Sequence, residues 1–330
     1  MEATQPTQRR LAGGTWTIAL VVLLLLCASA AVTACGGSST TASSSPSATI
    51  SSPTASPSIV PAAEPVSRWD APGSASLAQT RAAATRFADA LTAETIPEGG
   101  LYAKDATFDF WAGGETHNQG AKEIESTYKE GGEGKPGVGF DWERPHMLVA
   151  PGVVATEGVL AIPVDKVKMP YLQLLAVNGS RISHEEVFLD PGPDTKKAVT
   201  FAGSAPGPKD SATAASQAAT AVGDAFAAGD QTALRELLAP GVLFYDTELR
   251  HGVRGVDAVL AWQSRTPAVE LANQAPIAGP GWAVVRWTVR QTLSTGVQVA
   301  IPGATVMEVR DGKVVRMTVY YDNAVVGLQE

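Results

Sequence analysis

The same series of sequence features occurs twice along the chain, first within residues 76–193 and again within residues 211–330. Each copy begins with apolar residues at helical spacing, continues with a glycine that opens a further helix, and ends in several extended segments. Gly120 corresponds to Gly255 at an offset of 135 residues, and the other matched features lie 129 to 136 residues apart. A nearly constant offset is what duplication of one domain produces, so we expect two domains of the same fold.

The second copy shows its helix boundaries most clearly. Ser211 precedes alanines and valines at helical spacing and can cap the first helix, which Gly229 is expected to end. Asp230 can cap a short second helix, and the following Pro240-Gly241 pair is expected to break it. A third helix is expected over Val256–Gln263. In the first copy, the matching first helix is expected over 82–91.

Extended segments follow these helices. The Asp311-Gly312 pair is a strong signal for a two-residue hairpin. The expected strands of the second copy are 242–246, 269–277, Trp282–Thr292, 298–301 with 304–310, and Lys313–Tyr321. Helices followed by mostly antiparallel strands predict an α+β fold, here two tandem cone-shaped domains, each with about three helices packed on a curved sheet.

The second copy resembles a known family. Residues 228–246, the Arg254-Gly255 pair before a helix and the closing run 311–322 are similar to SnoaL-like domains of the nuclear transport factor 2-like superfamily. The first copy resembles them more weakly. The resemblance implies a pocket at the mouth of each cone. The superfamily includes polyketide cyclases, ketosteroid isomerases and epoxide hydrolases, together with members that have no known reaction, so the fold alone does not give the function.

The start of the chain resembles an export signal. Arg9 and Arg10 precede an apolar run over 16–27, and small residues follow it. The run Val32-Thr-Ala-Cys35 resembles the bacterial lipobox. We therefore expect cleavage after a signal peptide at 1–34, lipid such as palmitate on Cys35, and attachment to the extracytoplasmic face of the cell membrane. A retained transmembrane anchor and plain secretion remain the alternatives.

The predicted organisation follows from these segments. Residues 35–72 consist almost wholly of Ser, Thr, Ala, Pro and Gly and are expected to form a disordered tether. The divergent first domain is expected at 73–195, a linker at 196–210 and the second domain at 211–330.

Charge and cysteine content exclude several functions. Removing 1–34 takes away two arginines and one glutamate from 25 basic and 33 acidic residues, which leaves a net charge of −9. Nucleic-acid binding is therefore not expected, since it depends on clustered basic residues. Cys27 leaves with the signal and Cys35 carries lipid, so no disulfide is expected. No cofactor motif is present, and the four histidines lack metal-ligand spacing.

Three residues of the second copy are candidate catalytic groups. Asp322 lies where the resemblance implies an acidic residue on the last strand, and a buried carboxylate there can act as a general base. Arg286 or Tyr320 can hold an oxyanion. The alternative interpretation is that Asp322 ends the strand and that Tyr320 belongs to an amphipathic strand. Thr288 stands where epoxide hydrolases of this superfamily carry an aspartate, which argues against that reaction.

The first copy does not repeat these groups. Glu157 aligns with Arg286, and Phe188 aligns with Tyr320. If either cone has chemistry, we expect it in the second copy. The run His184-Glu185-Glu186 is interpreted as a solvated strand edge rather than a metal site.

Three functional hypotheses follow. The first is a non-catalytic module, for small-molecule binding or scaffolding, whose two domains pack as a pseudo-dimer within a monomeric chain. The second is an isomerase- or cyclase-type enzyme that uses acid–base chemistry on an apolar small molecule in the second copy. The third is a stalked surface protein whose cones contact cell-wall partners. The first is preferred because a duplicated pocket fold lacks a repeated catalytic set.

Overall fold

The computed structural model describes ten segments of the chain, and they contain both predicted domains. These segments are 73–93, 95–96, 100–111, 115–130, 141–162, 167–189, 208–246, 252–264, 270–292 and 298–321. The predicted signal peptide at 1–34, Cys35 and the tether at 35–72 lie outside them, as does most of the linker. No helix among the described segments is long and apolar enough to cross a membrane.

The first domain consists of two described helices and one six-stranded sheet. Its elements are α2 (Leu77–Ala93), β1 (Tyr102–Trp111), β2 (Glu115–Gln119), α3 (Ala121–Glu130), β3 (Asp141–Ala150), β4 (Val153–Ile162), β5 (Val167–Asn178) and β6 (Arg181–Leu189). The strand order is β2-β1-β6-β5-β4-β3. The first strand, β1, runs parallel to the last, β6, and every other described pair in this sheet is antiparallel.

The second domain has three helices and a seven-stranded sheet with the same core. Its elements are α4 (Ala212–Ala228), α5 (Gln231–Leu237), β7 (Leu238–Asp246), β8 (Val253–Arg254), α6 (Val256–Gln263), β9 (Glu270–Asn273), β10 (Ile277–Gly279), β11 (Trp282–Thr292), β12 (Gln298–Arg310) and β13 (Lys313–Tyr321). The order is β10-β11-β12-β13-β7-β8, with β9 also paired to β11. Again the first strand, β7, runs parallel to the last, β13.

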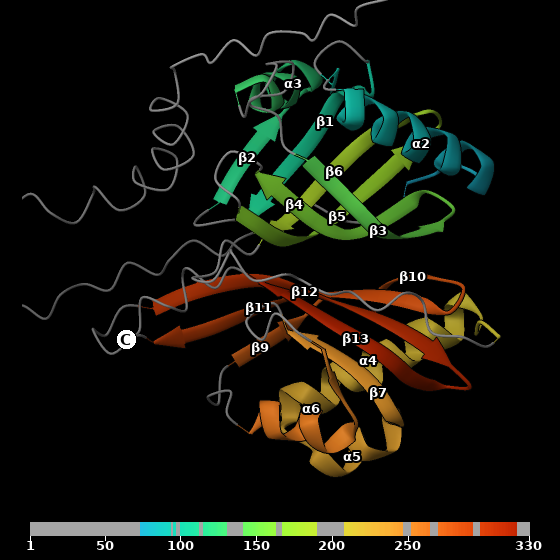
Figure 1. Cartoon of the computed structure of the whole chain (residues 1–330), viewed down its shortest axis with the longest axis vertical. Coiled ribbons are helices and arrows are strands. Elements are labelled where there is room, and N and C mark those ends of the chain that lie inside the picture. Colours follow the sequence, from blue (N-terminus) through green and yellow to red (C-terminus); the bar gives the residue numbers. More distant parts are fainter. Residues whose placement is uncertain are drawn as a thin grey trace, which may run out of the picture. The chain divides into compact units, whose positions relative to one another are not determined.

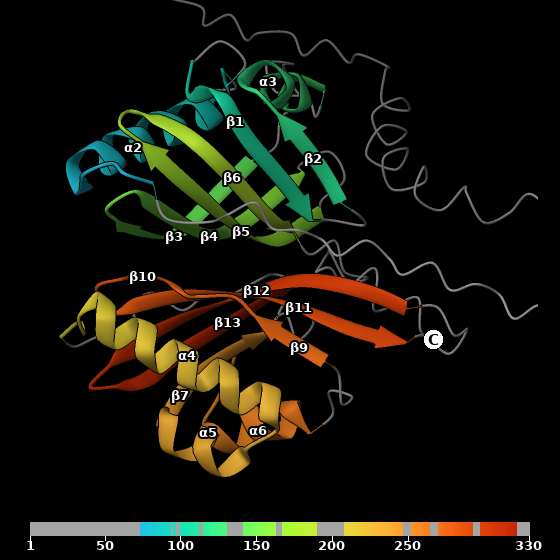
Figure 2. The ribbon, with the colours of Figure 1, turned by 180° about the vertical axis from the view of Figure 1, so that it is seen from behind.

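The two sheets share one topology, which confirms the predicted α+β class with two cone-shaped domains. In each, a hairpin of long strands lies between a parallel pair on one side and further antiparallel pairing on the other, with β3 in the first sheet and the short strands β9 and β10 in the second. Helices cover one face of each sheet: α2 and α3 lie on the first sheet in Figure 1, and Figure 2 shows α4 crossing the second with α5 and α6 beside it.

Helix caps in the second domain form where the sequence predicted them. The Ser211 side chain accepts a hydrogen bond from the Ala214 backbone N–H, and Asp230 accepts one from Ala233. Gly229 ends α4 in the left-handed conformation, with φ of 65°. In the first domain, α2 covers Leu77–Ala93 and so extends beyond the predicted 82–91 at both ends.

Three strand predictions for the second domain need correction. Strand β7 begins at Leu238 and contains the Pro240-Gly241 pair, because its pairing with β13 is interrupted there by a register shift. Strand β12 is continuous through Pro302, which is paired with Thr288 of β11. The segment expected over 269–277 is divided into β9 and β10.

Alternate residues of each sheet belong to different hydrophobic clusters. In each domain one cluster lies between the helices and the sheet. It contains Phe108 in the first domain and Phe244 in the second. A third cluster combines buried residues from both sheets, including Leu174 of β5 and Val306 of β12. Each sheet is therefore buried on two faces, one against its own helices and the other against the opposite sheet.

Candidate functional site

The predicted site residues Arg286 and Tyr320 lie on the sheet face away from the helices. On β11, Val285 belongs to the helix-side cluster, and its neighbour Arg286 points to the opposite face. On β13, Val319 belongs to the helix-side cluster, whereas Tyr320 belongs to the cluster shared by the two sheets. Both residues are buried. The structure thus places them between the sheets rather than inside the second cone.

Arg286 forms an ion pair with a carboxylate of the first domain. Its Nη1 lies 3.3 Å from Oε2 of Glu186 on β6, and both side chains are buried. The Trp111 indole donates to the other oxygen of Glu186 at 3.1 Å. Burial raises the pKa of Glu186, and the attraction of Arg286 offsets this only in part. The pair therefore links the sheets at the cost of desolvating both charges.

Tyr320 binds a second carboxylate of the first domain. Its hydroxyl donates to Oε1 of Glu157 on β4 at 2.9 Å, while Nη1 of Arg316 lies 2.7 Å from Oε2 of Glu157. Burial alone would raise the pKa of Glu157, but attraction by Arg316 and hydrogen bonds from His146 and Arg316 lower that pKa to about 2. Burial and the charge of Glu157 raise the pKa of Tyr320 well above its usual value. Tyr320 is thus held as a neutral donor.

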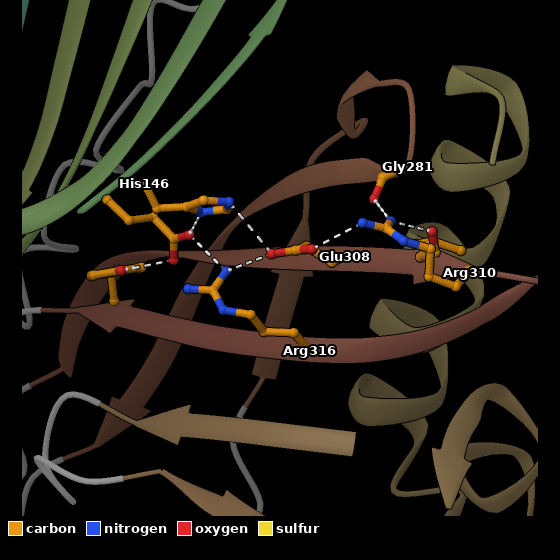
Figure 3. Close-up of polar contacts among 8 residues, drawn as sticks. His146, Gly281, Glu308, Arg310 and Arg316 are labelled. Atoms are coloured by element: carbon orange, nitrogen blue, oxygen red, sulfur yellow. Dashed lines mark hydrogen bonds and ion pairs between the residues drawn. The ribbon is translucent and has the colours of Figure 1, made fainter. Parts of the chain in front are cut away.

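The contacts of Glu157 are part of a larger buried network, shown in Figure 3. His146 lies between Glu157 and Glu308, with Nδ1 2.7 Å from the first and Nε2 3.5 Å from the second. Arg316 also reaches Glu308 at 3.4 Å, and Arg310 pairs with the other oxygen of Glu308 at 3.2 Å. This network joins strands β3 and β4 of the first sheet to β12 and β13 of the second.

A small hollow adjoins the ion pair of Arg286 and Glu186. Trp111 and Trp287 also contribute to its walls. It offers about 10 Å³ of room for the centre of a water molecule, which is enough for about one water. A drug-sized ligand needs a pocket of roughly 300 Å³ or more, so this hollow is not a small-molecule pocket.

The interior of the first cone contains a buried carboxyl group, Glu185, which was predicted to lie at a solvated strand edge. Glu185 of β6 accepts hydrogen bonds from the hydroxyls of Tyr102 at 2.5 Å and Tyr128 at 2.6 Å. The side-chain amide of Gln173 donates to it at 2.6 Å. Burial raises the pKa of Glu185 to about 7, although the three donors act to lower it.

The second cone has apolar residues at the matching positions. Phe108 pairs with Glu185 in the first sheet, and Phe244 pairs with Met317 in the second, so Met317 occupies the place of Glu185. Leu238 correspondingly occupies the place of Tyr102. No carboxyl group of the second cone therefore takes the place of Glu185. The hypothesis that any chemistry lies in the second copy stays a prediction, since Asp322 lies outside the described residues.

The run His184-Glu185-Glu186 is not a solvated strand edge. Strand β6 lies between β1 and β5, and all three side chains are buried. His184 lies on the face that carries Asp109 of β1, with Nε2 3.7 Å from Oδ2 of Asp109, and Nδ1 of His117 lies 2.5 Å from Oδ1 of the same carboxyl group. Among the described residues, no group of three or more His, Cys, Asp or Glu side chains is arranged to hold a metal ion.

Two predicted site residues lie outside the described residues. They are Asp322, the candidate base, and Cys35, the candidate lipidation site. Their roles stay predictions. The catalytic roles of Arg286 and Tyr320 also stay predictions. For either residue to bind a substrate, its contact with Glu186 or Glu157 would first have to break.

Comparison with known proteins identifies a family in one part of the chain. Residues 219–317 match the SnoaL-like domain. A nuclear transport factor 2-like protein of unknown function from Burkholderia pseudomallei is 22% identical over 35% of this chain and 96% of its own, with a TM-score of 0.32. A protein with a ketosteroid isomerase-like fold from Catenulispora acidiphila is 19% identical over 34% of this chain and 91% of its own, with a TM-score of 0.31. No curated protein matches the sequence.

Proposed function

We propose that this chain is a lipid-anchored extracytoplasmic protein whose two cone domains pair within one chain and serve as a non-catalytic scaffold. The second domain contains the SnoaL-like match, and the shared strand order supports a divergent SnoaL-like origin for the first. The lipobox-like run ending at Cys35 supports the anchor, and the Ser/Thr/Pro/Ala-rich segment at 35–72 supports a tether between the lipid and the domains.

One observation carries the non-catalytic part of the proposal. Arg286 and Tyr320, the described polar candidates of the second domain, are engaged with Glu186 and Glu157 of the first domain. A catalytic group must be free to contact its substrate in the reacting complex. These contacts instead hold two domains together, which is the role that fits buried, oriented side chains with charged partners.

The carboxyl group of Glu185 favours the same conclusion. Both of its oxygens already accept hydrogen bonds, from Tyr102 on one side and from Tyr128 and Gln173 on the other. A general base needs an oxygen directed at a substrate proton. Acid–base chemistry in the first cone would therefore have to use the one acceptor site of the carboxylate that these three donors leave.

We expect the soluble fragment beginning at residue 73 to be a monomer that carries no stoichiometric ligand. Native mass spectrometry of the fragment purified from its own host measures both properties at once. A retained apolar molecule would shift the function from scaffolding to small-molecule binding, and substrate turnover would favour the enzymatic alternative. A stable dimer of the wild-type fragment would contradict the proposed pairing within one chain.

Replacement of Cys35 by serine is expected to abolish lipid attachment, because without the thiol there is no thioether to carry lipid. It should also leave residues 1–34 on the chain, since cleavage of a lipobox takes place before a cysteine that already carries lipid. The mass of the full-length protein purified from its own host measures this change: the wild type should begin at residue 35 with added acyl mass, and the variant should keep residues 1–34 without it. A matched Ser38→Ala variant should behave as the wild type. A wild-type protein that keeps residues 1–34 and carries no lipid would argue for a retained apolar anchor.

A further inference from the structure

Strand pairing allows the two sheets to be compared residue by residue. Glu157 is paired with Leu172 in the first sheet, and Arg286 is paired with Ala304 in the second. Glu157 and Arg286 thus occupy the same position of the shared fold, on β4 and β11.

The last strands can be matched in the same way. Glu186 is paired with Leu174 in the first sheet, and Thr318 is paired with Val306 in the second. Glu186 therefore corresponds to Thr318, and residues two positions earlier, His184 and Arg316, correspond to each other.

The contacts between the sheets use the same two strands of the fold twice, at neighbouring positions. Glu157 of β4 reaches Arg316 and Tyr320, which lie on either side of Thr318 on β13. Arg286 of β11 reaches Glu186, the equivalent of Thr318, on β6. Such reciprocal use of one patch is the arrangement of an isologous two-fold interface. The two domains therefore meet as two copies of one subunit would meet in a homodimer.

The two sheets present opposite charges to each other at these contacts. The first sheet presents two carboxylates, Glu157 and Glu186, whereas the second presents two guanidinium groups, Arg286 and Arg316. All four side chains are buried. Pairing of the first domain with another first domain would place Glu157 against Glu186, with His184 as the nearby basic side chain. Pairing of two second domains would place Arg286 against Arg316, with Glu308 as the nearby acidic side chain.

Like charges brought together in a buried interface cost several kcal/mol, since water no longer screens them. We infer that each sheet face is selective for the sheet of the other domain and rejects a second copy of itself. The interaction surface fits one kind of partner, a cone domain with the opposite charge at these two positions, and in this chain that partner is supplied in cis. This inference rests on the proposed pairing of the domains within one chain.

The substitution Arg286→Glu tests the inference in the 73–330 fragment. Within one chain, the substitution places a carboxylate opposite Glu186 and so disfavours the pairing of the two domains. Between two chains, the new carboxylate can form an ion pair with Arg316 of the other chain, as Glu157 does now, so two second domains can pair with each other. We expect light scattering coupled to size exclusion to show twice the wild-type mass. The matched variant Arg286→Gln removes the ion pair without creating that complementarity and should remain monomeric. Adding Glu186→Arg to Arg286→Glu should restore the monomer.

The mirror variant Glu157→Arg provides a second readout if Arg286→Glu fails to fold. It makes the first domain complementary to itself through Glu186, in the manner of the present Arg286–Glu186 pair, and should also give a dimer. If the folded variants remain monomeric like Arg286→Gln, the selectivity is overturned while the pairing within one chain stands.

A protease site inserted within 196–207 of the otherwise unchanged fragment allows the two domains to be cut apart. This cleavage tests separately the pairing of the domains within one chain and the selectivity of their sheet faces. Pairing predicts that the halves stay together as a 1:1 complex in native mass spectrometry, and selectivity predicts that tagged and untagged samples exchange halves without forming homodimers. Homodimers of either half would overturn the selectivity alone. If the two halves dissociate after cleavage, both the pairing of the domains and its selectivity are overturned.

Discussion

Replacement of Arg316 by methionine is expected to lower the free energy of unfolding by about 3–5 kcal/mol, the usual cost of removing one partner from a buried ion pair. Arg316 is fully buried and contacts the carboxylates of Glu157 and Glu308. Its Nε and Nη2 have no hydrogen-bond partner among the described residues, so the charge depends on these two carboxylates for compensation. Urea denaturation of the 73–330 fragment at pH 7 measures the loss.

The same substitution at an exposed pair is the matched control. Arg235 lies 2.7 Å from Asp257, the same distance as Arg316 from Glu157, but both side chains of the control pair are largely exposed. Arg235→Met should cost no more than about 1 kcal/mol. A double variant, Arg316→Met with Glu157→Gln, should regain part of the loss, because it no longer leaves the Glu157 carboxylate unpaired. Equal effects of the two single methionine variants would show that Arg316 is effectively solvated.

The free energy of unfolding is expected to fall as the pH rises from about 4.5 to about 7. Burial raises the pKa of Glu185 from its ordinary 4.5 to about 7, so the folded protein holds a proton that the unfolded chain releases in this range. Stability from this group is complete below 4.5 and is lost as the pH approaches 7. The change is about 3 kcal/mol at most, at about 1.4 kcal/mol for each unit of pKa difference. Glu186, whose pKa is also raised, acts in the same direction.

An opposite trend is expected at lower pH. Glu157 has its pKa lowered to about 2, so its contribution is present above 4.5 and is lost as the pH falls from 4.5 to 2. The two trends together predict greatest stability near pH 4.5 to 5. Urea midpoints measured from pH 3 to 8 give the profile.

Glu185→Gln isolates the contribution of the first cone. This variant keeps the shape of the side chain and an acceptor for Tyr102, but it has no proton to lose. Its stability should fall less than that of the wild type between pH 4.5 and 7, with only the contribution of Glu186 remaining, and should exceed that of the wild type at pH 8. Glu236→Gln, at an exposed position, should leave the profile unchanged. A wild-type profile that rises over this range would mean that Glu185 is ionised at all these pH values.

The fold could be predicted from the sequence because local signals repeated in order. Gly120 and Gly255 each precede a helix and have positive φ, and Asp311 and Gly312 form the turn of the last hairpin with positive φ at both residues. These signals are short-range, so they can be read one at a time. The limits of β7 and β12 could not be predicted in this way, since whether Pro240 or Pro302 interrupts a strand depends on how the neighbouring strands pair with it.

The polar clusters were harder to predict because each sheet is buried on both faces. Alternation does place Glu185 on the face opposite Glu186, but two adjacent glutamates normally indicate a solvated strand. Here one faces the tyrosines of its own cone and the other faces Arg286 of the other domain. A signal was nevertheless present: Glu157 aligns with Arg286, so the two copies of the domain carry opposite charges at one equivalent position.

The parallel pairing of first and last strands has a consequence for how the chain folds. Strand β1 can form its hydrogen bonds to β6 only after β6 has been synthesised, and the same holds for β7 and β13. Each cone is therefore closed by contacts between residues some 75 positions apart in the sequence. Helices can form early, yet the tertiary fold of a cone assembles only after its final hairpin has emerged from the ribosome or the export channel. Until the second cone closes, Glu157 and Glu186 of the completed first sheet lack their arginine partners from the second sheet. The face of the first sheet is then exposed, and at this stage of folding we expect the chain to depend most on a chaperone.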